Sequence, residues 1–361
     1  MGLDPAAFLR ELVRTPSVSG EEAAAAELTA AALAAAGLEV ERLGDNVIAA
    51  VDGGPGPTLL LHSHLDTVGA GPSWSVDPWD AEWRDGSLTG LGANDAKGCA
   101  VAMSAAVAAW AQRPQRAGRV VLALVAREET NNRGMQDTLA HLGLPDGAVT
   151  GEPTGLEVVR SQAGLAVIEA HWKGRSCHAA HAARVDHDNA LLQAARELGA
   201  FPPALVLDAG HELLGPTTLV AAALHSGERH NRVPDAAEAL FDGRITPPHD
   251  AAACLAALQE RLPRAELRLR SDRLKPVDTP AGHPLVAAAL AAAGRPAAIG
   301  SNTLSDMALL AGVPAVKCGP GETARSHTPD EFLLRAELDA GVAFYSAFVP
   351  RALEALASCP A

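Results

Sequence analysis

A short apolar run that ends in a histidine and an aspartate places the strongest constraint on how this chain folds. Residues 59–61 are three leucines, and they lead directly into His64 and Asp66. A continuous apolar run of this length is typical of a strand that is buried on both faces of a sheet. Because sites in open α/β sheets are built at the carboxyl ends of strands, we expect functional side chains to begin at His64.

Two further apolar runs end in the same way. Residues 120–126 contain only valine, leucine and alanine and precede Glu128 and Glu129, and a shorter run at 148–151 precedes Glu152. Strands that alternate with helical patterns predict an α/β fold with a mainly parallel sheet and helices on both faces. The strands are expected at 38–43, 46–51, 58–62, 120–126 and 148–151, and the helices at 4–14, 20–37 and 98–112.

The helix expected at 20–37 has a start signal and a stop signal in the sequence. Ser19 precedes Glu22 by three residues, which is the spacing of a capping box. Gly37 stands where the helical pattern ends, as is common just beyond a helix.

The alternation of predicted strands and helices changes between residues 165 and 271. This stretch predicts the order β-α-β-β-α-β, with strands at 165–172, 217–225, 236–245 and 265–271 and helices at 187–199 and 249–262. The α/β pattern then returns, with helices at 283–293, 304–311 and 335–357 and a strand at 313–318. We therefore expect one domain formed by residues 1–164 and 272–361, interrupted by an inserted α+β domain at 165–271.

Composition excludes several classes of function. The 361 residues carry a formal net charge of −14, which argues against a nucleic-acid partner because such binding depends on lysine and arginine. The chain lacks the ~20 consecutive apolar residues of a membrane helix, and its N-terminus lacks a secretory pattern, so we expect a cytoplasmic protein. Five scattered cysteines without a C-x-x-C pair argue against a disulfide framework or a thiolate zinc site.

Histidine and carboxylate residues at strand ends and in a glycine-rich turn form a candidate metal site. Each lies where loops carry function on a rigid scaffold, although none has the local spacing of H-E-x-x-H. A ligand set of nitrogen and oxygen without thiolate suits two zinc ions, with cobalt or manganese as alternatives, and one bridging carboxylate. Two such ions activate a water molecule for hydrolysis. The candidate ligands are His64, Asp95, Glu129, Glu152 and His327.

Two further carboxylates suit supporting roles. Asp66 could accept the ring N–H of His64 and fix its tautomer, as carboxylates beside metal-bound histidines do. Glu128 could take a proton from the attacking water and pass it to the leaving amine. Taken singly, motifs such as His-x-Asp or Glu-Glu more often belong to surface turns or to pairs of solvated side chains. The occurrence of all these motifs in one chain favours a functional site.

In five motifs the sequence resembles the M20 metallopeptidases, in the branch of acetylornithine deacetylase and succinyl-diaminopimelate desuccinylase. The resemblance extends over essentially the whole chain and keeps the family's order. The motifs are Ser63-His64-Leu65-Asp66-Thr67-Val68, residues 92–98 around Asp95, Glu128-Glu129, Gly151-Glu152-Pro153, and residues 319–331 around His327.

The resemblance implies a role for each candidate ligand. His64 and Glu152 bind one metal, Glu129 and His327 bind the other, and Asp95 bridges the two. It further implies that Asp66 orients His64 and that Glu128 is the general base and acid. The implied fold is a di-zinc exopeptidase-like catalytic domain with an inserted ferredoxin-like lid that forms a homodimer.

The resemblance also implies three site residues in the lid. His178 is similar to the histidine that reaches across the dimer to stabilise the oxyanion, with His181 and His187 as nearby alternatives. Asn231 and Arg244 lie in segments similar to those that contact the substrate carboxylate, a task suited to arginine. The proline that often follows the lid histidine is absent here, which leaves the conformation of this loop open.

We therefore expect a metal-dependent hydrolase that acts on a small N-acyl amino acid, with N-acetylornithine, in arginine biosynthesis, as the leading substrate. Within the family the alternatives are succinyl-diaminopimelate desuccinylase, acetylcitrulline deacetylase, a hydrolase of carrier-protein-linked lysine or ornithine, and a dipeptidase. A non-catalytic binding protein on the same fold is the alternative from another class. A cysteine hydrolase that uses Cys177 and His178 is disfavoured, because adjacent residues on a strand point to opposite faces.

Overall fold

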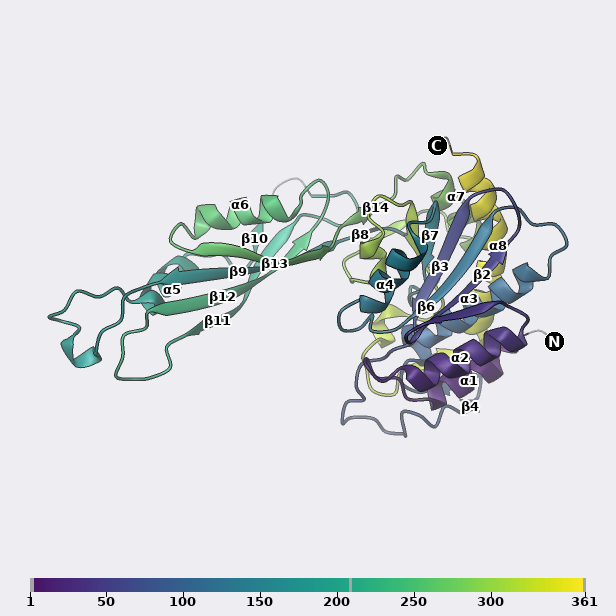
Figure 1. The fold of residues 1–361 in the computed structure, drawn as a ribbon, viewed down its shortest axis with the longest axis horizontal. Coiled ribbons are helices and arrows are strands. Elements are labelled where there is room, and N and C mark those ends of the chain that lie inside the picture. The colour runs from purple at the N-terminus through teal and green to yellow at the C-terminus, as the bar shows by residue number, and fades with distance from the viewer. Residues whose placement is uncertain (1–2, 208–209, 360–361) are drawn as a thin grey trace. The chain divides into compact units, whose positions relative to one another are not determined.

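The computed structural model describes residues 3–207 and 210–359, which form two compact units (Figure 1). The first unit contains the chain up to Arg160, Asp278–Gly300, and the residues from Ser305 onward. The second unit contains Ser161–Val277 together with Ser301–Leu304. The boundaries expected from the sequence, after residues 164 and 271, lie close to these positions.

A nine-stranded mixed sheet runs through the first unit in the order β1-β2-β6-β3-β7-β16-β8-β14, with β15 beside β8. The four central strands β6, β3, β7 and β16 are parallel, whereas β1, β2 and β8 pair antiparallel with their neighbours. The expected α/β fold is confirmed, and its parallel part is the centre of the sheet. The strands are β1 (Val40–Leu43), β2 (Asn46–Asp52), β3 (Thr58–His64), β6 (Arg119–Val125), β7 (Gly147–Thr150), β8 (Val159–Gln162), β14 (Val277–Asp278), β15 (Ile299–Ser301) and β16 (Ala315–Lys317).

The central strands are buried on both faces, as their continuous apolar runs predict. Leu59 and Leu61 of β3 enter the main hydrophobic core, which also contains residues of α1, α3 and α8. Leu60, which points to the opposite face, is only 2% exposed. The helices of this unit are α1 (Pro5–Arg14), α2 (Ala23–Ala35), α3 (Gly98–Ala111), α4 (Arg133–Leu142), α7 (Pro284–Ala293) and α8 (Arg335–Ala357), shown from purple to yellow in Figure 1.

The expected capping box at the start of α2 is wrong. The helix begins at Ala23, and its N-cap residue Glu22 makes no side-chain cap hydrogen bond. The Ser19 hydroxyl instead donates to Asp66, and Glu22 accepts from the backbone N–H groups of Gly20 and Arg127. Both side chains therefore form hydrogen bonds near the candidate site instead of a capping box at the start of α2.

Two other local expectations differ from the structure. The α-helix expected at 304–311 is a single 3-10 turn, η3 (Asp306–Leu309), because the Ser305 hydroxyl caps it and Gly312, at φ +86°, turns the chain toward β16. Helix α4 was not expected, since Gly134 weakens its helical pattern. That glycine is required by packing, because a Cβ there would lie 2.2 Å from the Ala126 carbonyl oxygen.

A small three-stranded sheet, β17-β5-β4, completes the first unit. Its strands β4 (Trp83–Arg84) and β5 (Ser87–Thr89) come from the segment before Asp95, and β17 (Phe332–Leu334) comes from the segment after His327. Pairing of β17 with β5 therefore brings two distant motifs of the sequence together.

The second unit is an antiparallel sheet in the order β10-β11-β12-β9-β13, with helices α5 and α6 (Figure 1). Both helices contribute to one apolar core with Ile168, Trp172 and Phe241 of the sheet. The expected order β-α-β-β-α-β is present with one addition, because the two-residue strand β10, which the sequence did not predict, precedes β11. The elements are β9 (Gly164–Lys173), α5 (Ala190–Gly199), β10 (Leu205–Val206), β11 (Thr218–Ser226), β12 (Ala236–Ile245), α6 (Ala251–Arg261) and β13 (Glu266–Leu274). Within the residues described, no helix has both the length and the apolar character needed to cross a membrane.

Candidate metal centre

The parallel strands of the first unit deliver the candidate ligands to one edge of the sheet. Strand β3 ends at His64, β6 ends just before Glu128 and Glu129, and β7 ends two residues before Glu152. Because these strands run in the same direction, their carboxyl ends meet at the same edge. His327 arrives from the segment between β16 and β17.

Asp95 lies between the two candidate histidines. Its Oδ1 is 3.3 Å from Nε2 of His64, and its Oδ2 is 3.8 Å from Nε2 of His327. Both carboxylate oxygens of Glu129 lie 3.0 Å from the same His327 nitrogen. Donor atoms of His64, Asp95 and Glu129 all lie within 4.8 Å of one another. The structure thus brings together four of the five candidate ligands, with one carboxylate oxygen directed to each histidine.

Glu152, the fifth candidate, is partly buried near this group. Burial and the charge of Asp95 raise the pKa of Glu152 to about 8, and the charge of His64 acts in the opposite direction. Burial also raises the pKa of Glu129. Carboxylates that are crowded together away from water suit a site that receives cations.

The donor set fits divalent metal ions. Two carboxylates and two imidazoles converge with the carboxylate of Glu152 nearby, and these are ligands that zinc, cobalt and manganese share. Burial disfavours the charged form of His64, yet hydrogen bonds to Asp66 and Asp95 hold the pKa of His64 well above its usual value. This attraction between ring and carboxylates shows that the cluster favours positive charge.

Asp66 connects the ligands to their supporting turn. The carboxylate is fully buried, and its two oxygens accept the backbone N–H groups of Glu128 and Glu129 at 3.0 and 3.1 Å. Nδ1 of His64 lies 2.9 Å from the backbone oxygen of Asp66 and 3.5 Å from its Oδ1. The Ser19 hydroxyl donates to the other carboxylate oxygen at 2.6 Å. Asp66 therefore contacts both the ring of His64 and the segment that carries the two glutamates.

Glu128 lies in a partly buried position beside the ligands. Burial raises the pKa of Glu128 well above its usual value, and the charges of Glu152, Asp306 and Glu129 act in the same direction. Arg127 just before it adopts φ +61°, which turns the chain sharply at the end of β6. This turn directs the glutamate pair toward the strand ends.

Sequence reasoning missed Glu331 as a residue of the site. Its carboxylate is 2% exposed and accepts three backbone N–H groups, those of Asn94 and Asp95 at 2.8 and 2.9 Å and that of Gly92 at 3.2 Å. Glu331 therefore holds the turn that presents Asp95. Its position four residues after His327 was the available signal, but the partly exposed Asp330 beside it looks equivalent in the sequence.

Lys97 was also missed. Its side chain is fully buried and donates to the backbone oxygens of Leu12 and Thr15 at 3.0 and 3.1 Å. Burial lowers the pKa of Lys97 to about 7, and the charges of Glu331 and Asp66 partly oppose this shift. Lys97 thus ties the end of α1 to the turn that carries Asp95.

We expect Glu331→Gln to weaken metal binding about 10- to 100-fold, the range typical of groups that support metal ligands. The glutamine amide presents N–H groups toward a set of backbone donors, so the turn at Asp95 loses acceptors. Equilibrium dialysis followed by metal analysis measures this change. Asp330→Asn is the matched control, because Asp330 is only partly buried and accepts from the backbone N–H of Ser75 instead. Equal metal affinity in the two variants would contradict the role of Glu331.

The candidate residues of the lid lie in the second unit. Ala179 next to His178 donates its backbone N–H to the Asn231 carbonyl at 3.0 Å, so His178 and Asn231 share one end of the lid sheet. Arg244 lies toward the other end of β12 and forms an ion pair with Asp242 at 2.8 Å. The structure therefore brings His178 and Asn231 together and separates Arg244 from them. Their roles stay predictions.

Comparison with known proteins gives consistent matches. Residues 60–351 match the model of peptidase family M20/M25/M40. The chain is 32% identical over 376 aligned positions to a protein of Xanthomonas oryzae pv. oryzae named succinyl-diaminopimelate desuccinylase, covering 95% of this chain and 97% of the relative. A protein of the same name from Granulibacter bethesdensis is 35% identical over 263 positions, covering 68% of this chain and 67% of the relative.

Solved structures show the same fold at lower identity. Aminopeptidase PepT from Bacillus cereus matches with a TM-score of 0.78 at 20% identity, covering 96% of this chain and 98% of that one. A dinuclear metal binding peptidase from Bacillus subtilis matches with a TM-score of 0.74 at 16% identity, covering 97% of this chain and 98% of that one. Such identities support the fold and carry no conclusion about substrate.

Proposed function

From the premise that this chain belongs to peptidase family M20/M25/M40, and is therefore a metallohydrolase, we propose that it releases the acyl group from an N-acyl amino acid. The observation that carries the proposal is the convergence of Asp95 and Glu129 on the two histidines, with the partly buried Glu128 beside them. A non-catalytic binding protein would not need a carboxylate held at that position beside the ligands.

Each step of amide hydrolysis can be assigned to residues of this chain. Metal ions held by His64, Asp95, Glu129, Glu152 and His327 polarise a carbonyl group and lower the pKa of water when they are bound. Glu128 accepts a proton as water adds to the acyl carbon, and it returns that proton to the nitrogen as the C–N bond breaks. Asp66 holds the ring of His64 in place.

The lid has a proposed part in the same reaction. By resemblance, His178 of a second copy donates a hydrogen bond to the oxyanion that develops on the acyl group. Asn231 and Arg244 are the proposed contacts of the substrate carboxylate. This arrangement requires a homodimer formed through the lid, which sedimentation analysis of the purified protein tests.

N-succinyl-diaminopimelate replaces N-acetylornithine as the leading substrate. The relatives that are 32–35% identical are named as desuccinylases, and one of them is matched over 95% of this chain. The expectation of an acetylornithine deacetylase rested on short phrases around Asp95 and His327. A match over nearly the whole chain carries more weight than such phrases.

We expect the zinc-loaded protein to hydrolyse N-succinyl-diaminopimelate with a kcat/KM at least ~10-fold higher than N-acetylornithine, because a site that binds the extra succinyl carboxylate loses that contact with an acetyl group. A panel that also contains acetylcitrulline and dipeptides measures this preference. The Glu128→Gln variant, prepared in the same way, controls for contaminating hydrolases. Equal or faster turnover of N-acetylornithine would restore the first expectation.

A further inference from the structure

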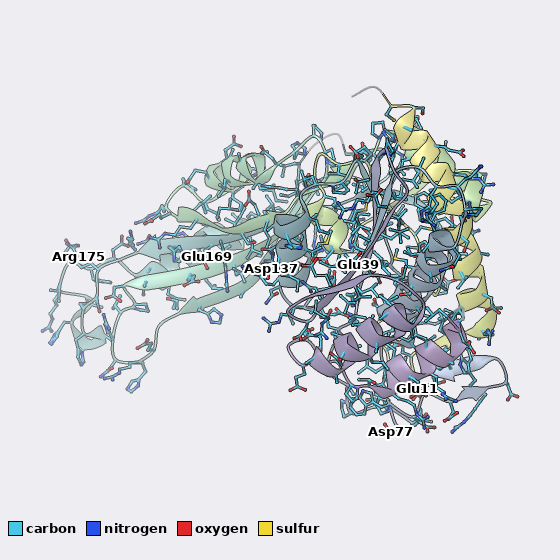
Figure 2. All side chains as sticks on the ribbon, turned by 45° about the vertical axis from the view of Figure 1, so that its right-hand side comes forward. Glu11, Glu39, Asp77, Asp137, Glu169 and Arg175 are labelled. Atoms are coloured by element: carbon cyan, nitrogen blue, oxygen red, sulfur yellow. The ribbon has the colours of Figure 1, made fainter. Side chains whose placement is uncertain are left out.

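One face of the lid sheet carries a group of histidines and glutamates that the proposed reaction does not use. On β9, Ile168, Ala170 and Trp172 enter the core with α5 and α6. Glu169 and His171 alternate with them, so their side chains lie on the opposite face of the sheet. Figure 2 labels Glu169 in this unit.

The strand register aligns this group across three neighbouring strands. His171 of β9 is the Cα partner of Glu238 on β12, and Glu238 is the partner of His225 on β11. Directly opposed residues of antiparallel strands have their side chains about 4.5–5.5 Å apart at Cβ. Two histidines therefore flank one glutamate on the same face.

The side-chain atoms of this group already approach one another. Nε2 of His171 lies 3.3 Å from Oε2 of Glu169, and Nδ1 of the same ring lies 3.9 Å from Oε2 of Glu238. One donor atom from each of the three residues lies within 4.8 Å of the others. The side chains of His171, Glu169 and Glu238 are 22%, 23% and 51% exposed, so they are accessible to ions and have room to rotate.

Two neighbouring cations pair with another carboxylate, and a third pairs with Glu169. Glu266, the partner of His171 on the other side, is occupied by Lys173 and Arg268. Within residues 3–207 and 210–359, His171 is the one ion-pair partner of Glu238. Arg270 forms an ion pair with Glu169 at 3.7 Å, so a bound ion would share Glu169 with this arginine.

The two histidines and Glu238 also share one hollow of about 350 Å³. Four-coordinate zinc takes imidazole and carboxylate ligands at about 2.0–2.2 Å, so the exposed His225 side chain must rotate toward the other three residues to complete the site. Calcium and magnesium prefer oxygen ligands alone, so the two imidazoles favour a transition ion.

We infer that His171, Glu238, Glu169 and His225 form a second metal site, on the lid, for a divalent transition ion such as zinc. The ion joins strands β9, β12 and β11, so its binding stabilises the folded lid by mass action. This site uses none of the ligands of the catalytic centre. It is therefore separable from the catalytic centre by mutation.

The test is metal stoichiometry of the full chain. Wild-type protein, His171→Ala and His225→Ala are dialysed against rising concentrations of buffered free zinc, and bound zinc is counted by mass spectrometry. Wild-type protein is expected to bind one more ion per chain than His171→Ala, and His225→Ala is expected to bind that ion at least tenfold more weakly. Both variants are expected to keep wild-type turnover, which also shows that they fold.

His141→Ala is the matched control. His141 forms an exposed pair with Glu41 at 2.9 Å in the first unit, without a second carboxylate within ion-pair distance among the described residues. This variant is expected to keep the wild-type zinc count. Equal zinc counts in wild type and His171→Ala would overturn the site, and so would an equal loss in His141→Ala, since that result indicates non-specific binding.

Discussion

Replacing Glu128 by glutamine is expected to lower kcat by about 10²- to 10⁴-fold, the range of a positioned general base, without loss of metal. Glutamine has nearly the same shape as glutamate but cannot accept the proton of the attacking water. The backbone contact of residue 128 with Asp66 does not depend on the side chain, so the turn stays in place. The variant therefore separates proton transfer from metal binding.

Single-turnover kinetics and metal analysis of the same preparation measure the two effects. Glu157→Gln is the matched control, because Glu157 is a partly exposed glutamate of the same unit that pairs with Arg295. That variant is expected to retain full turnover. Retention of most activity by Glu128→Gln, with ions bound, would remove Glu128 from the proton pathway and leave another group as the base.

Replacing Asp95 by asparagine is expected to have the second large effect. It weakens metal binding, whereas the Glu128 variant impairs proton transfer. Asp95 directs one oxygen toward each histidine, so loss of its charge weakens the binding of both ions. A Lewis acid contributes several kcal/mol to the transition state. At about 1.4 kcal/mol for each factor of ten, we expect kcat/KM to fall by roughly 10³-fold or more.

Metal content distinguishes this variant from Glu128→Gln. Asp95→Asn is expected to bind fewer ions per chain, and excess zinc is expected to restore part of the turnover. Asp85→Asn is the matched control, because Asp85 is an exposed turn residue at φ +50°, a conformation that asparagine adopts readily. Full metal content in Asp95→Asn would show that Asp95 does not bridge the ions.

Much of the fold could be predicted from the periodicity of the chain. The apolar runs of β3 and β6 required burial on both faces, and the alternation in β9 required one apolar and one polar face. Those patterns depend on neighbouring residues along the chain. Local signals failed where distant contacts competed with them, as at Ser19, whose hydroxyl donates to Asp66 instead of capping α2.

Some features of the candidate site could likewise be predicted from the sequence, and others could not. The order of the motifs placed His64, Glu129 and Glu152 at the ends of parallel strands, and parallel strands bring their ends together. The sequence could not distinguish Glu331 from Asp330, because their difference is burial. Only the pairing of β17 with β5 places the Glu331 carboxylate against the turn of Asp95.

The sequence by itself therefore determined the fold class, the family and the candidate ligands, since each depends on residue type, order and local period. The tertiary structure decided which buried groups hold Asp95 in place between the two histidines and which lid residues face one another across strands. These features depend on contacts between segments far apart in the chain, such as Asp95 with His327 and His171 with Glu238. Local sequence patterns do not encode the distances between such segments.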